Sequence, residues 1–279
     1  MTLDAHQHFW KFDPVRDQWI DDSMRVLQRD FLPDELTRIY AQHGIDGCVA
    51  VQADQSPAET RFLLDLAAQY PIIKGVVGWV DLRATDLEAQ LEAYTAFTVL
   101  KGFRHIVQGE PDVNFMLRPD FRRGIGLLEK YGFTYDILIF PHQMGAALEL
   151  VRAYPQQRFV LDHLGKPYIK DGFYTGWATM LRALGQCDNL WCKVSGLVTE
   201  ADWQHWTDAD MAPYLDTAFE VFGPQRLMYG SDWPVSLLGG EYGRVKGIVD
   251  RYLARLSAAE RGLVMGEVGV GFYGVGNVN

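Results

Sequence analysis

The sequence has few cysteines and no long apolar run. Its three cysteines, Cys48, Cys187 and Cys192, form no Cys-x-x-Cys pair, which favours buried thiols in a reducing compartment over a disulfide framework. No apolar stretch approaches the length needed to span a bilayer, and no basic segment followed by an apolar stretch opens the chain. We therefore expect a cytoplasmic protein with no membrane partner.

Positive charge and nucleotide-binding glycine patterns are also scarce. The 26 lysines and arginines are outnumbered by 36 acidic residues, and the formal net charge is -10. Because an acidic surface repels phosphate backbones, we expect no nucleic-acid partner. Neither Gly-x-Gly-x-x-Gly after the first expected strand nor Gly-x-x-x-x-Gly-Lys-Ser/Thr occurs, which argues against a dinucleotide fold and a phosphate-binding loop.

The chain does contain a regular alternation of apolar, β-branched runs and amphipathic stretches. Hydrophobic residues make up 48% of its 279 residues, enough for a sizeable core. We expect strands at residues 4–8, 47–52, 75–79, 100–105, 134–139, 158–162, 190–195 and 226–230. Helical spacing occurs at residues 33–43, 56–69, 86–97, 121–131, 143–154, 175–185 and 210–222.

This alternation predicts an α/β protein with a parallel sheet. About eight strand–helix units in a chain of this length favour a single (β/α)8 TIM-type barrel over an open sheet, with residues 1–279 as one domain. The carboxyl ends of barrel strands meet at one mouth, where we expect the active site. Residues 9–31 form a long first connection that we expect to lie across this mouth.

Five polar residues fall at the expected strand ends. His6 and His8 lie two positions apart on the first strand, so both point to the same face and could hold a metal ion or an oxyanion. The histidine pair alone is equally consistent with satisfied structural side chains. Arg104, His163 and Asp232 end the fourth, sixth and eighth strands, and the barrel would bring them to the same pocket.

An ordered set of motifs resembles the amidohydrolase superfamily, specifically the sugar-lactonase branch of its amidohydrolase 2 group. Each motif is weak alone, but together they cover nearly the whole chain: DAHQHFW (4–10), VQADQ (51–55), GVVGWVDL (75–82), KGFRH (101–105), DHLGKP (162–167) and YGSDWP (229–234). The resemblance implies a barrel hydrolase that opens a sugar lactone, and it includes members that bind zinc and members that work without a metal.

Lactone hydrolysis needs an activated water, a polarised carbonyl and a proton for the leaving alkoxide. Asp232 is the expected general base, and His163 and Arg104 are the expected catalytic partners. One zinc ion held by His6 and His8 could lower the pKa of a bound water to roughly 7. Without a metal, these imidazoles could donate hydrogen bonds to the carbonyl oxygen. Two-metal relatives use a bridging carboxylated lysine or glutamate on strand four, but Lys101 comes too early in its strand, so we expect one metal or none.

The expected partner is a small, neutral sugar lactone. Its apolar face could stack on Trp10, Trp79, Tyr135 or Trp233, each of which could instead simply pack in the core. Gln52 and His142 complete the expected substrate-binding set: Trp10, Gln52, Trp79, Tyr135, His142 and Trp233.

Several alternatives stay open at this point. One is a metal-dependent amide hydrolase or decarboxylase of the same superfamily, and another is a non-catalytic binding protein on a barrel scaffold. The oligomeric state is open as well, with a homo-oligomer among the options.

The last segment departs from the family pattern, which usually reads Asn-x-x-x-Phe-Tyr-Gly. Here it is Glu267-Val268-Gly269-Val270-Gly271-Phe272-Tyr273-Gly274. Glycine in place of a helix former weakens a helix by roughly 1 kcal/mol per residue. We therefore expect a weak terminal helix that does not reach the pocket.

Overall fold

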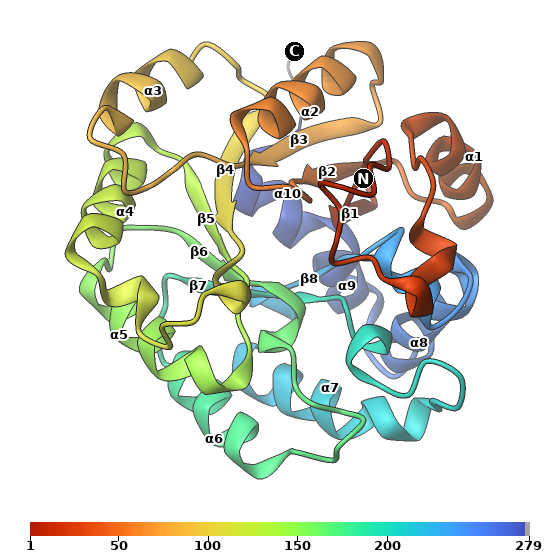
Figure 1. Cartoon of the computed structure of the whole chain (residues 1–279). Helices are drawn as coiled ribbons and strands as arrows, with labels where there is room; N and C mark the ends of the chain where they lie inside the picture. Colours follow the sequence, from red (N-terminus) through yellow and green to blue (C-terminus); the bar gives the residue numbers. More distant parts are fainter. Residues whose placement is uncertain (277–279) are drawn as a thin grey trace.

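The computed structural model describes residues 1–276, and the predicted domain's last three positions, 277–279, lie outside the described residues. Eight parallel strands form one sheet in sequential order from β1 to β8 (Figure 1). Their bounds are β1 Leu3–Gln7, β2 Gly47–Val51, β3 Ile73–Gly78, β4 Leu100–His105, β5 Thr134–Ile137, β6 Phe159–Leu161, β7 Leu190–Val194 and β8 Leu227–Tyr229.

The sheet closes between β1 and the segment that follows β8. The backbone N–H of Asp232 donates to the His6 carbonyl at 2.8 Å, and that of His8 donates to the Trp233 carbonyl at 2.7 Å. These bonds form at the mouth, so closure of the sheet itself sets Asp232 beside the two strand-1 histidines. The prediction of a (β/α)8 barrel is confirmed.

Helices surround the barrel, and their ends follow local sequence signals. Pro33 supplies the preset φ of a first turn in α1, and Gly44 ends that helix at φ 66°. The Ser56 hydroxyl accepts a hydrogen bond from the Glu59 N–H at 3.2 Å and caps α2. The bounds are α1 Pro33–His43, α2 Pro57–Gln69, α3 Leu87–Tyr94, α4 Pro119–Tyr131, α5 Met144–Ala153, α6 Thr175–Leu184, α7 Asp208–Phe222, α8 Tyr242–Leu253, α9 Ala258–Gly262 and α10 Val268–Tyr273.

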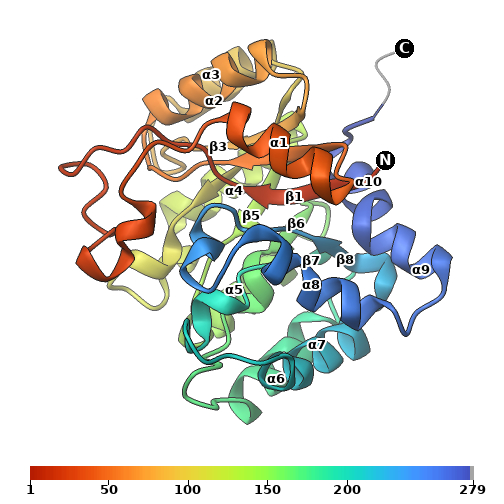
Figure 2. The same ribbon diagram turned by 90° about the vertical axis from the view of Figure 1, so that its right-hand side faces the viewer.

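The C-terminal segment closes the end of the barrel opposite the mouth (Figure 2). A π-helical turn, Leu263–Glu267, leads into α10, where Phe272 and Tyr273 pack in the barrel interior with strand residues such as Leu3 and Val77. The glycine-containing segment does form a helix. Moreover, the Tyr273 hydroxyl donates to Asp136 Oδ2 on β5 at 2.8 Å, so α10 contacts a buried carboxylate inside the barrel, a contact that we did not expect.

The long connection after β1 projects at the mouth, as Figure 2 shows, and includes the 3-10 turn Asp22–Leu27. Trp10 and Phe31 pair through two backbone hydrogen bonds of 2.9 and 3.1 Å, which fasten both ends of the connection together. Within residues 1–276, no helix has both the length and the apolar character needed to cross a membrane.

Candidate active site at the barrel mouth

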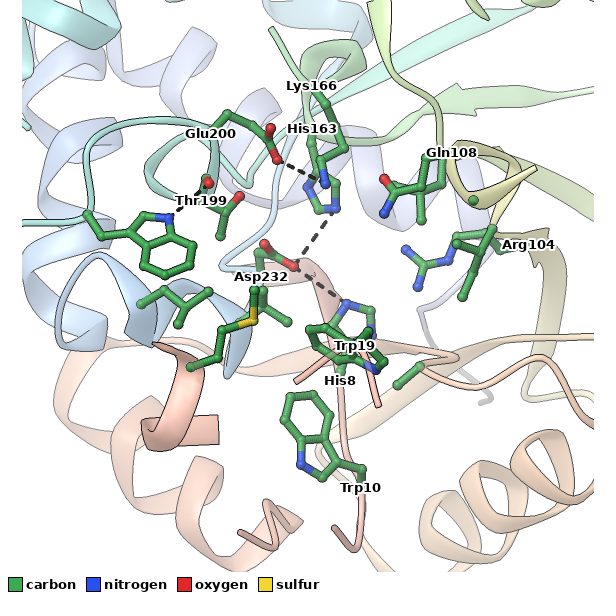
Figure 3. A pocket seen from close by; sticks show the side chains of 18 residues that line it. His8, Trp10, Trp19, Arg104, Gln108, His163, Lys166, Thr199, Glu200 and Asp232 are labelled. Carbon is green, nitrogen blue, oxygen red and sulfur yellow. Dashed lines mark hydrogen bonds and ion pairs between the residues drawn. The ribbon is translucent and has the colours of Figure 1, made fainter. Parts of the chain in front are cut away.

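A cavity of about 450 Å³ opens at the C-terminal ends of the strands (Figure 3). Its polar lining comes from strand ends and the loops after them: His8, Arg104, Gln108, His163, Lys166, Thr199, Glu200 and Asp232. Aromatic and aliphatic side chains complete the wall: Trp10, Trp19, Met24, Ala53, Ile106, Leu138, Trp203, Val235 and Leu238, with Gly109. The cavity is therefore a mainly apolar chamber with polar groups on one side, which suits a small organic substrate.

Three imidazoles surround the Asp232 carboxylate. Asp232 Oδ1 lies 3.5 Å from His8 Nε2 and 3.9 Å from Nε2 of both His6 and His163. Figure 3 shows the His8 and His163 rings pointing at this carboxylate from two sides. The sequence prediction that residues from the first, sixth and eighth strands meet here agrees with this arrangement.

The backbone at His163 and Asp232 has an unusual conformation. Asp232 has φ 55°, and residues 163–166 all have φ between 50° and 70°, the left-handed region that ordinary side chains seldom adopt. Such residues cost of order 1 kcal/mol each and persist where surrounding contacts hold them. Ser195 Oγ lies 2.8 Å from His163 Nδ1, and Trp177 Nε1 donates to the Leu164 carbonyl at 2.7 Å. These contacts fix the turn that directs His163 into the cavity.

A glycine beneath this turn makes room for the ring. A Cβ at Gly196, whose φ is 63°, would lie 2.5 Å from His163 Nδ1. Any larger residue would displace the imidazole from Ser195.

Arg104 enters the site from β4 with its guanidinium held in place. Its Nη1 donates to Asp162 Oδ2 at 3.0 Å, and its Nη2 donates to Gln52 Oε1 at 3.0 Å and to the Gln52 carbonyl. Gln52 therefore lies behind Arg104 and orients it instead of lining the cavity. A guanidinium fixed on two sides presents its remaining donor atoms in a constant direction.

A layer of buried charge lies directly below the cavity. Lys193 on β7 is fully buried, and its Nζ lies 2.5 Å from Asp136 Oδ2 and 3.0 Å from both Asp162 Oδ1 and His6 Nδ1. Sequence reasoning missed Lys193. The available signal was a single lysine within the apolar run Leu190–Val194, at a position whose alternation points into the barrel.

Burial and charge together set the protonation of these groups. Burial lowers the pKa of His163 to about 4, and burial together with the Lys193 cation lowers the pKa of His6 well below its usual value. Burial alone would raise the pKa of Asp232, but the His163 and His8 imidazoles outweigh it and the net shift is downward. At neutral pH the site thus holds an ionised carboxylate beside neutral His6 and His163.

Of the six expected substrate-binding residues, the structure places one in the cavity wall and the others outside it. Trp10 lines the cavity. Tyr135 is fully buried on the helix-facing side of β5, between Phe121 and Phe159. Trp233 is also buried, with its ring 5.2 Å from that of Phe31.

Trp79 and His142 also lie outside the cavity, as Gln52 does. Trp79 follows β3, where its backbone pairs with the Thr60 hydroxyl, and His142 is exposed beside Tyr168. Instead, loop residues that sequence reasoning did not select line the wall: Trp19, Gln108, Thr199, Glu200 and Trp203. Loops show no periodicity that reveals which side chains turn inward, although residues 9–31 were expected at the mouth.

The donor set at the mouth fits a divalent metal ion. His6, His8 and Asp232 each offer a ligand atom, all within 4.8 Å of one another, and imidazole with carboxylate is a typical zinc ligand set. His8 Nδ1 bonds the Val51 carbonyl at 2.8 Å, which leaves its Nε2 lone pair facing the cavity. Lys101 is far from this set, because its Nζ donates to the Gly274 carbonyl at the opposite end of the barrel.

A buried carboxylate among imidazoles at the mouth of a (β/α)8 barrel is an arrangement suited to a hydrolase. The amidohydrolase family model matches residues 3–267, and the chain belongs to this family.

Curated and solved relatives agree with this assignment. L-fucono-1,5-lactonase from Burkholderia multivorans is 41% identical over 95% of this chain and 93% of its own. L-fucono-1,5-lactonase from Burkholderia ambifaria is 35% identical over 86% of this chain and 83% of its own. A crystal structure of an amidohydrolase from Burkholderia multivorans with bound zinc superposes with a TM-score of 0.96 at 40% identity, covering 99% of this chain and 100% of that one.

Proposed function

We propose that this hydrolase opens a sugar lactone, an L-fuconolactone-like aldonolactone, to the corresponding sugar acid. The observation that carries the proposal is the position of Asp232, whose carboxylate lines the cavity and lies 3.5 to 3.9 Å from three imidazole nitrogens. The names of the two Burkholderia relatives support the substrate class.

In the proposed reaction, water attacks the lactone carbonyl carbon while Asp232 takes the proton from that water. The resulting tetrahedral oxyanion is stabilised by donors on the polar side of the cavity, with Arg104 and His163 as the candidates. The ring C–O bond then breaks, and protonated Asp232 returns its proton to the leaving alkoxide oxygen. Proton and charge balance, because one water is added across one ester bond.

A divalent metal such as zinc would be held by His6, His8 and Asp232. When bound, it would supply a Lewis acid that acidifies water or polarises the carbonyl. The zinc bound in the Burkholderia relative supports metal binding by this chain. Without it, Arg104 and the neutral His163 imidazole would provide the polarising donors.

The cavity wall suits a small sugar ring. Trp10, Trp19 and Trp203 offer flat apolar surfaces for one face of the ring. Gln108 and the ion pair between Lys166 Nζ and Glu200 Oε1, which are 2.9 Å apart, offer donors and acceptors for hydroxyl groups. We further propose a cytoplasmic location, which the three free, buried cysteines support.

A panel of aldonolactones followed with a pH indicator tests the proposal, with metal-free and zinc-loaded protein assayed in parallel and the spontaneous rate subtracted. We expect rapid acid release from L-fuconolactone or a stereochemical neighbour. No release above background from any lactone in either form would refute the lactonase proposal. Turnover of amide or carboxylate substrates that is abolished by a chelator would replace it with a metal-dependent amidohydrolase or decarboxylase.

A further inference from the structure

The His6 ring lies between a cation and another imidazole. On one side, Lys193 Nζ is 3.0 Å from His6 Nδ1, and on the other, His8 Nε2 is 3.2 Å from His6 Nε2. An ammonium group only donates hydrogen bonds. Nδ1 of His6 must therefore accept the hydrogen bond from Lys193, and an imidazole that accepts at Nδ1 carries its proton on Nε2.

The hydrogen bond between His8 and the Val51 carbonyl agrees with this assignment. His8 Nδ1 lies 2.8 Å from the Val51 carbonyl, which can only accept, so Nδ1 of His8 carries a proton. Nε2 of His8 then carries no proton and can accept the hydrogen bond that His6 Nε2–H donates. Hydrogen bonds consequently run in one direction, from Lys193 through His6 and His8 to Val51, with each donor matched to an acceptor.

The opposite assignment leaves a conflict. Arg104 Nη1 lies 3.3 Å from His6 Nε2 and could donate to it if that nitrogen had no proton. In that case two unprotonated Nε2 atoms would face each other at 3.2 Å, and Lys193 would point its hydrogens at a protonated Nδ1. The shorter contact to Lys193 and the match at His8 favour the proton on Nε2.

Lys193 is held firmly where it is. It is fully buried and its Nζ contacts Asp136 and Asp162, while the Tyr273 hydroxyl of α10 donates to the same Asp136 oxygen at 2.8 Å. Residues of β5, β7, α10 and the turn after β6 thus converge to keep an ammonium group beside His6.

We propose that Lys193 is a positioning residue that holds His6 in the Nε2-protonated tautomer and thereby weakens divalent-metal binding at His6, His8 and Asp232. A metal ligand needs a free lone pair, so zinc binding through His6 Nε2 requires its proton to move to Nδ1. Asp162 Oδ1 lies 3.3 Å from His6 Nδ1 and could accept a hydrogen bond from a proton there, as the carboxylate partner of a metal-bound histidine does. However, Lys193 already donates a hydrogen bond to this nitrogen and so disfavours a proton on it.

The wild-type protein provides the first test. Long-range ¹H–¹⁵N correlation spectra of protein with ¹⁵N-labelled histidine report the tautomer of each of the seven histidines, and the His6→Gln variant identifies the His6 signals. We expect protonated Nε2 and unprotonated Nδ1 at His6 in metal-free protein. A proton on Nδ1 would overturn the proposal, and this measurement does not depend on any Lys193 variant folding.

Zinc affinity provides the second test, measured by competition with a chromogenic chelator. Lys193→Met keeps the aliphatic stem but removes the ammonium group, and we expect it to bind zinc about tenfold more tightly than wild type, the usual scale of effects beside a metal ligand. Lys101→Met, a lysine at the opposite end of the barrel, should bind zinc as wild type does. Equal or weaker zinc binding by folded Lys193→Met would overturn the proposal. Neither test uses a substrate, so both are independent of the lactonase proposal.

Discussion

The carboxylate of Asp4 accepts a hydrogen bond from the backbone N–H of Ser231 at 2.8 Å. The same oxygen, Oδ1, accepts from the His6 N–H at 3.2 Å, while Oδ2 accepts from the Tyr40 hydroxyl at 2.9 Å. Asp4 is fully buried, and these bonds connect β1 to the residue directly before Asp232. One side chain behind the barrel wall thus fixes the spacing between the strand-1 histidines and the proposed base.

We predict that Asp4→Ala loses about 3 kcal/mol or more of unfolding free energy, because it leaves two buried N–H groups and a hydroxyl without acceptors. Asp4→Asn keeps Oδ1 as an acceptor for both N–H groups and should cost clearly less. Urea unfolding of the two variants checks this order. Equal losses in both would show that the charge of Asp4, and not its acceptor geometry, stabilises the contact between β1 and Ser231.

Replacing Asp232 by asparagine should lower kcat by about 10²- to 10⁴-fold, the range for loss of a general base. Asparagine has nearly the same shape, so the thermal unfolding midpoint should change little. Initial rates on the best lactone from the panel provide the measurement. Asp188→Asn, an exposed carboxylate after α6, serves as the control and should retain the wild-type rate. Residual activity near wild type in Asp232→Asn would remove Asp232 from the proposed role.

Trp19 is 44% exposed, lines the cavity and makes an edge-on contact with Trp10, with ring centroids 6.0 Å apart. We predict that Trp19→Ala raises KM by about threefold to tenfold, as expected for loss of one aromatic surface, and leaves kcat nearly unchanged. Val26→Ala, an exposed residue of the same connection, should leave both constants as they are. A drop in kcat with constant KM would contradict a binding role for Trp19.

Glu59 is 5% exposed, and burial raises its pKa from the usual 4.5 to about 7. Between these values the folded protein retains a proton that the unfolded chain has lost, so unfolding free energy falls as pH rises through this window. From pH 5 to pH 8 this loss amounts to about 2 kcal/mol.

Glu59→Gln keeps an acceptor for the Ala53 N–H, which Glu59 Oε1 binds at 2.9 Å, but cannot ionise. Its stability relative to wild type should therefore increase between pH 5 and pH 8, as measured by urea unfolding at both values. A constant difference would mean that Glu59 titrates normally.

Two glycines of the C-terminal segment should respond in opposite ways to alanine. A Cβ at Gly271 in α10 has no atom within 4 Å, so Gly271→Ala should stabilise the protein by about 0.5–1 kcal/mol. A Cβ at Gly266 would lie 2.0 Å from the Met1 carbonyl oxygen, so Gly266→Ala should destabilise it by about 1–3 kcal/mol. Thermal unfolding distinguishes the two, and a shift of the same sign in both would contradict this packing.

The bounds of β4 could be predicted from the sequence, whereas the direction of one side chain on β5 could not. The bounds of β4, residues 100–105, were predicted without error, because an apolar run between two amphipathic helices is a local signal. Tyr135 was selected as a pocket residue from its position alone, but side chains alternate along a strand. Arg104 pairs in register with Asp136, and both belong to the interior polar network, so Tyr135 faces the helices.

The sequence by itself determined the order of strands and helices, the barrel class, and the meeting of His6, His8, Arg104, His163 and Asp232 at one mouth. These follow from periodicity and from the rule that parallel strand ends share an edge. Only the tertiary structure decided which loop side chains line the cavity and which buried groups lie beneath it. Lys193 is the clearest case, because a buried charge is stable only with partners from other strands, and spacing along one strand cannot reveal them.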